Sequence, residues 1–93
     1  MAKRINGDHE IIFTVKMPQQ KGCLPCEIVI GKRDTEFEPY VAWHCFGGNS
    51  YSWGHYVQTK EDAMEEVIYK AKNELHCSEQ NARWYVEKCG VNL

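Results

Sequence analysis

The chain has 93 residues and a mass of 10.8 kDa, which predicts a single domain over residues 1–93. Apolar residues make up 43% of it and charged residues 26%, which excludes an intrinsically disordered chain. The formal net charge of −2 argues against a nucleic-acid binder, because such proteins ordinarily carry a basic excess. No apolar run approaches the roughly 20 residues of a membrane span, and the first ten residues lack the apolar stretch of a secretory signal.

Two strands are expected in the first third of the chain. Residues 1–7 contain no pattern of a regular element and are expected to be frayed. Residues 10–17 are rich in β-branched and aromatic side chains and end at Pro18, which predicts a strand. Residues 26–30 predict a second strand, which ends at a glycine.

A C-x-x-C pair, Cys23 and Cys26, precedes the second strand. It is interpreted as two ordinary thiols at a strand entry, with a zinc site or a redox pair as alternatives. A zinc site would need further ligands, for which His44–Cys45 and His76–Cys77 are the candidates. Because the total of five cysteines is odd and no export signal is visible, we expect a reduced, cytoplasmic setting.

The middle of the chain predicts a β-hairpin. Two runs typical of strands, residues 40–46 and 51–57, flank the loop Gly47–Gly48–Asn49–Ser50. A turn centred on Gly48 and Asn49 predicts two sets of facing pairs. One face would hold Phe46–Tyr51, His44–Trp53 and Ala42–His55, and the other Cys45–Ser52, Trp43–Gly54 and Val41–Tyr56. A slip of one residue would exchange the faces of one strand.

The last third predicts helices. Thr59 can cap a helix that extends to about residue 75, with an apolar stripe on one side. Residues 78–90 fit a second helix capped by Ser78, although residues 82–86 would also serve as a strand. The expected fold class is α+β, with about four antiparallel strands followed by one or two C-terminal helices on one face.

The sequence contains no recognisable catalytic or phosphate-binding motif. In the predicted register, His44 and His55 are diagonal neighbours on one face, an arrangement that could support a metal or acid–base pair. Such histidines are more often half-buried structural residues of a sheet. We therefore expect a protein that is not an enzyme and needs no cofactor, with zinc at Cys23 and Cys26 as the alternative.

Aromatic residues are dense between Phe37 and Tyr56. A sheet covered by helices on one side can bury only one face of them, and exposed rings are typical of contact surfaces. The alternatives are that the C-terminal segment covers the second face or that the chain forms a homodimer through it. Base stacking is not expected, because no Lys or Arg lies between Arg33 and Lys60.

The candidate partner-binding residues combine one face of the hairpin with the acidic start of the first helix. The acidic residues could face a basic partner, or they could form an ordinary solvated helix face. The set comprises Tyr40, His44, Phe46, Tyr51, Trp53, His55, Glu61 and Glu65.

The hairpin also carries a family resemblance. Pro39–Trp43, then Gly48–Tyr56 with the motif W-G-H-Y, then Glu61–Ala63 resemble small uncharacterised proteins of phages, plasmids and conjugative elements of Gram-positive bacteria. The resemblance covers residues 39 to about 75 and does not include the C-x-x-C pair. It implies an accessory protein that binds a host or element-encoded protein, and it carries no catalytic residue to this chain.

The sequence therefore predicts a non-enzymatic, cytoplasmic binding protein of a mobile genetic element, which contacts a protein partner through the aromatic hairpin. An inhibitor of host defence, similar to anti-CRISPR proteins, is the special case. A small zinc-binding domain is the alternative. Neither a membrane nor a nucleic acid is expected as a partner.

Overall fold

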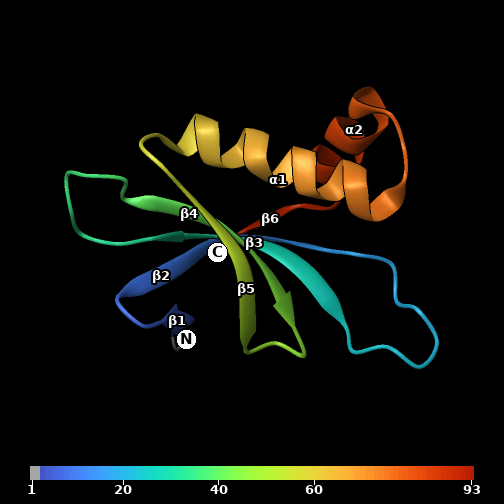
Figure 1. The fold of residues 1–93 in the computed structure, drawn as a ribbon, viewed down its shortest axis with the longest axis horizontal. Helices are drawn as coiled ribbons and strands as arrows, with labels where there is room; N and C mark the ends of the chain where they lie inside the picture. Colours follow the sequence, from blue (N-terminus) through green and yellow to red (C-terminus); the bar gives the residue numbers. More distant parts are fainter. Residues whose placement is uncertain (1–2) are drawn as a thin grey trace.

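A computed structural model describes residues 3–93 and confirms the α+β fold class, with two helices after the main strands (Figure 1). The predicted hairpin and both predicted helices are present, and residues 82–86 are helical. The elements in chain order are β1 (Ile5–Asn6), β2 (His9–Lys16), β3 (Cys26–Lys32), β4 (Tyr40–Phe46), β5 (Ser50–Val57), α1 (Lys60–Leu75), α2 (Glu79–Cys89) and β6 (Val91–Asn92).

The strands form one antiparallel sheet in the order β1-β2-β3-β4-β5, in which neighbours in the chain are neighbours in space. The C-terminal strand β6 returns to pair with β2 beside Phe13 and Thr14. The outer edge of β2 is therefore covered by two short strands, β1 at one end and β6 at the other. The strand at the opposite edge is β5, the second strand of the hairpin.

The expectation of a frayed segment over residues 1–7 is wrong for Ile5–Asn6, which pair with β2. The reason is a set of long-range contacts, which a local sequence pattern does not predict. Arg4, just before β1, donates hydrogen bonds to side chains of β3 and β5. Residues 1 and 2 lie outside the described part of the chain.

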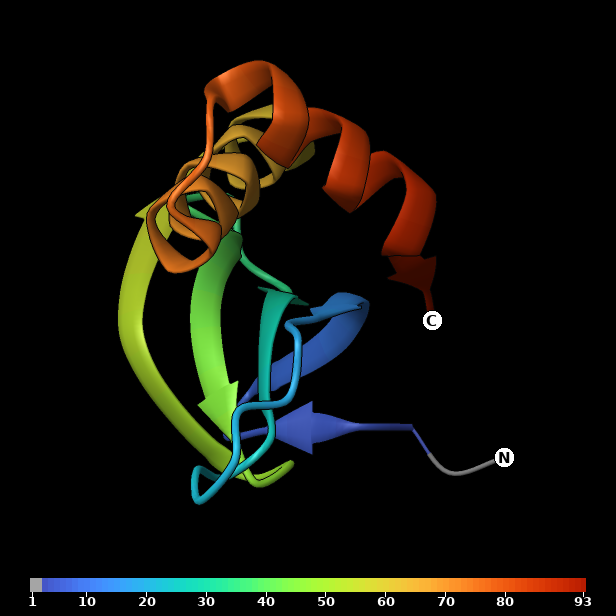
Figure 2. The same ribbon diagram turned by 90° about the vertical axis from the view of Figure 1, so that its right-hand side faces the viewer.

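Both helices lie on the same face of the curved sheet (Figure 2). The Thr59 hydroxyl accepts a hydrogen bond from the Asp62 amide, and the Ser78 hydroxyl accepts one from the Asn81 amide, so both predicted caps are confirmed. The apolar stripe of α1 packs on the sheet and forms the main core. The buried residues that the two helices contribute to this core are Ala63, Val67, Ile68 and Ala71 of α1 and Ala82 and Val86 of α2.

The face away from the helices carries a second, smaller core around Trp43. This indole is only 7% exposed and makes edge contacts with His9, Tyr51 and Tyr56, whose ring centroids lie 5.0, 5.4 and 6.5 Å away. Trp43 covers Gly54, the residue that it was predicted to face, since a Cβ at Gly54 would lie 2.6 Å from Trp43 Nε1. The chain's own aromatic side chains therefore cover much of this face.

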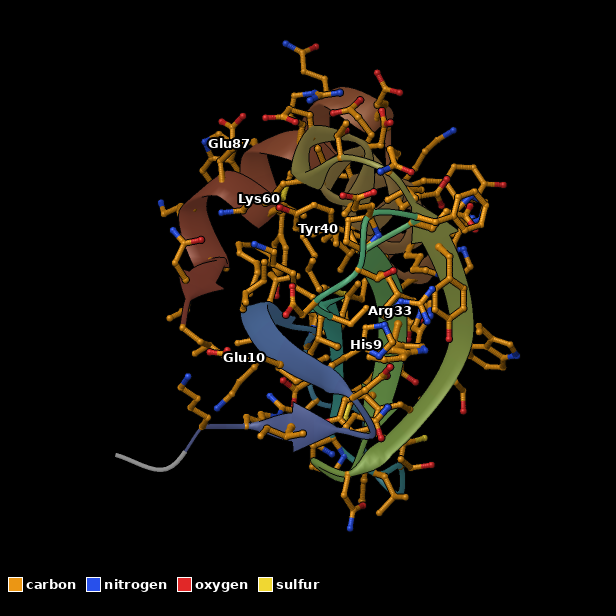
Figure 3. The ribbon with its side chains drawn as sticks, turned by 90° about the vertical axis from the view of Figure 1, so that its left-hand side faces the viewer. His9, Glu10, Arg33, Tyr40, Lys60 and Glu87 are labelled. Atoms are coloured by element: carbon orange, nitrogen blue, oxygen red, sulfur yellow. The ribbon has the colours of Figure 1, made fainter. Side chains whose placement is uncertain are left out.

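Beside this second core, the buried His9 and the partly buried Arg33 lie near each other, away from the helices (Figure 3). Lys60 and Glu87, by contrast, lie on the helical layer. Over residues 3–93, no helix is long and apolar enough to cross a membrane.

Candidate functional site

The hairpin contains a β-bulge at Trp53. Tyr56 faces Val41 and His55 faces Ala42, as predicted, but beyond the bulge Ser52 faces His44 and Tyr51 faces Cys45. The predicted pairs nearer the turn are therefore wrong by one residue. Trp53 is the extra residue, and its backbone has a φ of 56°, a left-handed conformation that costs a non-glycine residue about 1–2 kcal/mol.

The bulge brings three rings together on the helix side of the hairpin, and we call His44, Phe46 and Trp53 the hairpin cluster. The Trp53 ring stands edge-on to His44 and Phe46, with centroid separations of 5.1 and 5.7 Å. His44 and Phe46 are stacked at 6.2 Å. Trp53 is 67% exposed, whereas His44 is 8% exposed, so the cluster has a buried base and an exposed tip.

Side chains from α1 and from the loop before β3 border the hairpin cluster. Lys70 of α1 donates a hydrogen bond from Nζ to the Trp53 carbonyl at 2.7 Å. A cavity of about 110 Å³ beside Phe46 is lined by Leu24 and by Glu74 near the end of α1. Leu24 is exposed. The surface therefore has an apolar centre and a charged border, which is the composition of a protein contact site.

The structure divides the remaining predicted residues among separate places. Tyr40 packs against the main core, and Tyr51 lies on the opposite face, against Trp43. His55 is exposed and its Nε2 lies 3.5 Å from Glu66 Oε1. The predicted single aromatic face is therefore split, because the bulge moves Tyr51 away from Phe46 and Trp53.

The two acidic residues of the set lie on α1. Glu61 is exposed in its first turn. Glu65 forms a bidentate ion pair with Arg83 of α2, with both nitrogen–oxygen distances at 2.8 Å. Arg83 lowers the pKa of this carboxyl below its ordinary value. Glu65 therefore joins the two helices, and nothing brings it to the hairpin cluster.

The two cysteines of the C-x-x-C pair line the same small cavity, and Cys26 is the cross-strand partner of Phe46. Cys23 is exposed and Cys26 is half-buried at the start of β3. Burial raises the pKa of Cys26 to about 11, which disfavours the thiolate that metal binding or redox exchange requires. The described residues contain no group of three or more His, Cys, Asp and Glu side chains placed to hold a metal ion.

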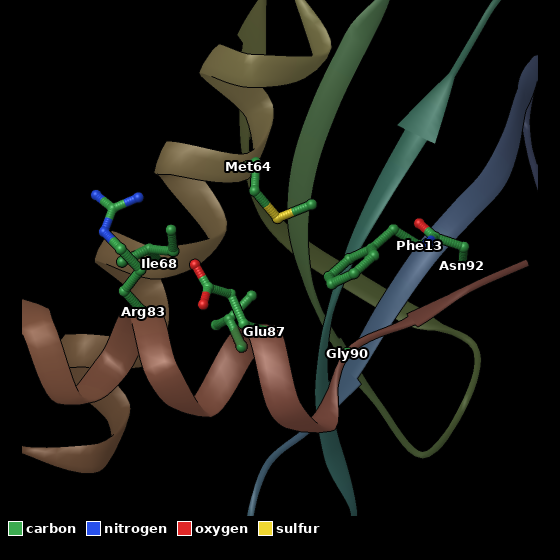
Figure 4. A pocket seen from close by; sticks show the side chains of 8 residues that line it. Phe13, Met64, Ile68, Arg83, Glu87, Gly90 and Asn92 are labelled. Carbon is green, nitrogen blue, oxygen red and sulfur yellow. The ribbon is translucent and has the colours of Figure 1, made fainter.

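A second cavity, of about 280 Å³, lies between α1, α2 and β2 (Figure 4). Its floor is apolar and includes Phe13, Met64 and Ile68, while Arg83 and Glu87 stand at its polar side. Arg83 is already paired with Glu65. The lining residues include one carboxylate, Glu87, and no serine, cysteine or histidine beside it.

Arg4 organises a polar network on the Trp43 side that the sequence did not indicate. Its Nη1 donates to Glu27 Oε1 at 2.7 Å and its Nε to the Tyr51 hydroxyl at 3.2 Å. Thr14 also donates to Glu27. Burial opposes ionisation of Glu27, but the bonds from Arg4 and Thr14 lower its pKa below the ordinary value. The network links the segment before β1 to β3 and β5, and the Tyr51 hydroxyl accepts one of its hydrogen bonds.

Two buried histidines are expected to make the fold sensitive to mild acid. Burial lowers the pKa of His9 and His44, and neither His9 Nε2 nor His44 Nδ1 has a hydrogen-bond partner among residues 3–93. Below the ordinary value of 6.5 the unfolded chain binds protons that the folded chain refuses. The free energy of unfolding should therefore be highest above pH 6.5. It should fall as the pH drops toward the lowered pKa values of the two histidines, by up to about 1.4 kcal/mol per pH unit for each histidine.

The measurement is chemical denaturation between pH 7.5 and 5. His44→Phe should reduce the pH dependence of the free energy of unfolding. The lowered carboxyl groups do not interfere, because Glu27 and Glu65 lose their contribution only below their ordinary pKa of 4.5. Equal slopes for wild type and His44→Phe would contradict the assignment.

Comparison with protein-family models, with curated proteins and with solved structures finds no match.

Proposed function

We propose that this chain is a non-enzymatic binding protein that contacts another protein through the hairpin cluster. The observation that carries the proposal is Trp53 itself, a large ring that is 67% exposed on a left-handed backbone. Because the Trp53 ring is exposed, its burial contributes little to the stability of the fold. The strain of its left-handed backbone is therefore not offset by packing of the ring. Strained, exposed residues are typical of functional surfaces, and tryptophan is enriched among the residues that dominate binding energy.

The surroundings of Trp53 support the same proposal. Phe46 and His44 of β4 form a stacked base that the indole contacts edge-on. The ring is therefore positioned before any partner arrives, which lowers the entropy cost of binding. Leu24 extends the apolar surface, while Lys70 and Glu74 give its border both signs of charge.

The finer part of the proposal concerns the partner. The resemblance of the W-G-H-Y segment to proteins of Gram-positive mobile elements favours a host or element-encoded protein, with a defence component as the special case. That step rests on the resemblance alone. The geometry of the hairpin cluster supports contact with a protein, and the partner is to be identified by capture.

The test compares two substitutions at Trp53. Glycine adopts a left-handed backbone without strain, so Trp53→Gly should be more stable than Trp53→Ala by about 1 kcal/mol, the reverse of the order in a regular strand. Both variants should lose at least about tenfold in partner capture, because an interface tryptophan commonly contributes 2 kcal/mol or more. Stability is measured by denaturation, and capture by quantitative pull-down from a Gram-positive lysate.

The matched control is Trp84→Ala, which removes another exposed tryptophan, from α2. Capture should be unaffected in this control, and also in Tyr51→Phe, since Tyr51 lies on the opposite face. A captured protein retained equally by wild type and folded Trp53→Gly would overturn the proposal.

A further inference from the structure

The two edges of the sheet differ in how they are protected. The outer edge of β2 is covered by β1 and β6. At the other edge, β5 pairs only with β4 within residues 3–93, and most of its residues are exposed. An eight-residue strand with one unpaired side is a template for another strand.

The bulge gives this edge a particular symmetry. Tyr51 and Tyr56 are five positions apart and would lie on opposite faces of a regular strand. Because Trp53 is the extra residue, both rings lie on the same face and pack on Trp43. Ser52 and His55 share the helix side in the same way, facing His44 and Ala42.

We propose that the occupant of this edge is a second copy of the chain, paired antiparallel through β5 with a twofold axis at Gly54, and with Trp53 outside the pairing as the extra residue. In this register Tyr51 faces Tyr56 of the other copy, and Ser52 faces His55. Residues that face each other in an antiparallel pair must share a side of the sheet, and both pairs do so only because of the bulge. The proposal goes beyond the proposed function, since it uses the backbone edge.

The contacts beside the edge fit the same register. Lys70 is fixed at the level of Trp53 by its 2.7 Å bond to that carbonyl, which also satisfies the bulge within the chain. Glu66 lies at the level of His55, 3.5 Å from its ring. Since His55 of the other copy faces Ser52, Lys70 and Glu66 of different copies come to neighbouring levels with opposite charge. The symmetry repeats this pairing, so the edge is complementary to itself in charge as well as in pattern.

The test uses two variants of opposite charge, Ser52→Lys/His55→Lys and Ser52→Glu/His55→Glu. Each places like charges opposite each other across the proposed axis and should dissociate. An equimolar mixture should form a heterodimer roughly tenfold tighter than either variant alone, because two cross-strand charge pairs change from repulsive to attractive. Sedimentation velocity up to about 1 mM is appropriate, because small interfaces bind weakly.

The matched controls, Gln20→Lys/Gln80→Lys and Gln20→Glu/Gln80→Glu, change the charge by the same amount at exposed positions away from β5. They should dimerise as wild type does and show no such mixing preference. A wild-type protein that is monomeric throughout the range would overturn the proposal, and so would a dimer indifferent to the β5 charges. If a charged variant fails to fold, amide exchange of wild type decides, since outward N–H groups of β5 must slow with increasing concentration.

Discussion

Replacing Arg4 with methionine is expected to lower the free energy of unfolding by about 2–3 kcal/mol, although Arg4 lies almost at the start of the chain. Its ion pair with Glu27 is largely buried, with the two side chains 28% and 14% exposed. Removal of the guanidinium leaves the Glu27 carboxylate on a covered face with Thr14 as its remaining donor. The cost of that unpaired charge is the physical reason for the large effect.

The matched control is Lys3→Met, one residue away. Lys3 pairs with Glu10 at 3.7 Å, but its side chain is 71% exposed, and such pairs contribute about 0–1 kcal/mol. The double variant Arg4→Met/Glu27→Gln should recover part of the loss, because no charge then remains unpaired. Urea denaturation of wild type and the three variants measures the loss and its partial recovery. If Arg4→Met costs no more than Lys3→Met, the network does not stabilise the fold.

The elements of this fold could be predicted because each leaves a local pattern. The caps Thr59 and Ser78, the apolar stripe of α1 and the two runs around Gly47–Ser50 are short-range signals. The bulge leaves no such signal, because it is one extra residue in an otherwise regular strand. Its consequence is large, since every side chain nearer the turn changes face.

The candidate site could be predicted only in part, because it depends on the bulge and on contacts between distant residues. Phe46 and Trp53 come together as expected with His44, but Tyr51 does not. The position of Glu65 depends on Arg83 of another helix, and a helix-to-helix ion pair cannot be read from the pattern of either helix. The N-terminal strand was missed because the contacts of Arg4 reach residues 23 and 47 positions away.

The second large effect is expected at Gly54, where alanine should lower the free energy of unfolding by about 2–3 kcal/mol. The new Cβ would lie 2.6 Å from Trp43 Nε1 and 3.3 Å from Val41 Cγ2. The indole cannot retreat across the sheet, because its other end already lies against Gly31, where a Cβ would be 2.8 Å from Cζ3. The Trp43 ring thus spans two glycine positions, one on β3 and one on β5.

A double-mutant cycle separates this clash from the ordinary cost of changing a strand residue. Trp43→Phe removes the indole atoms that approach Gly54 and should itself destabilise the fold through the space left behind. On that background Gly54→Ala should cost less than half of what it costs in wild type, while Ser52→Ala in the same strand should cost little in either. Additive costs for Gly54→Ala and Trp43→Phe would show that the ring does not require the glycine. The second core would then rest on the surrounding rings, with no contribution from the bare backbone beneath Trp43.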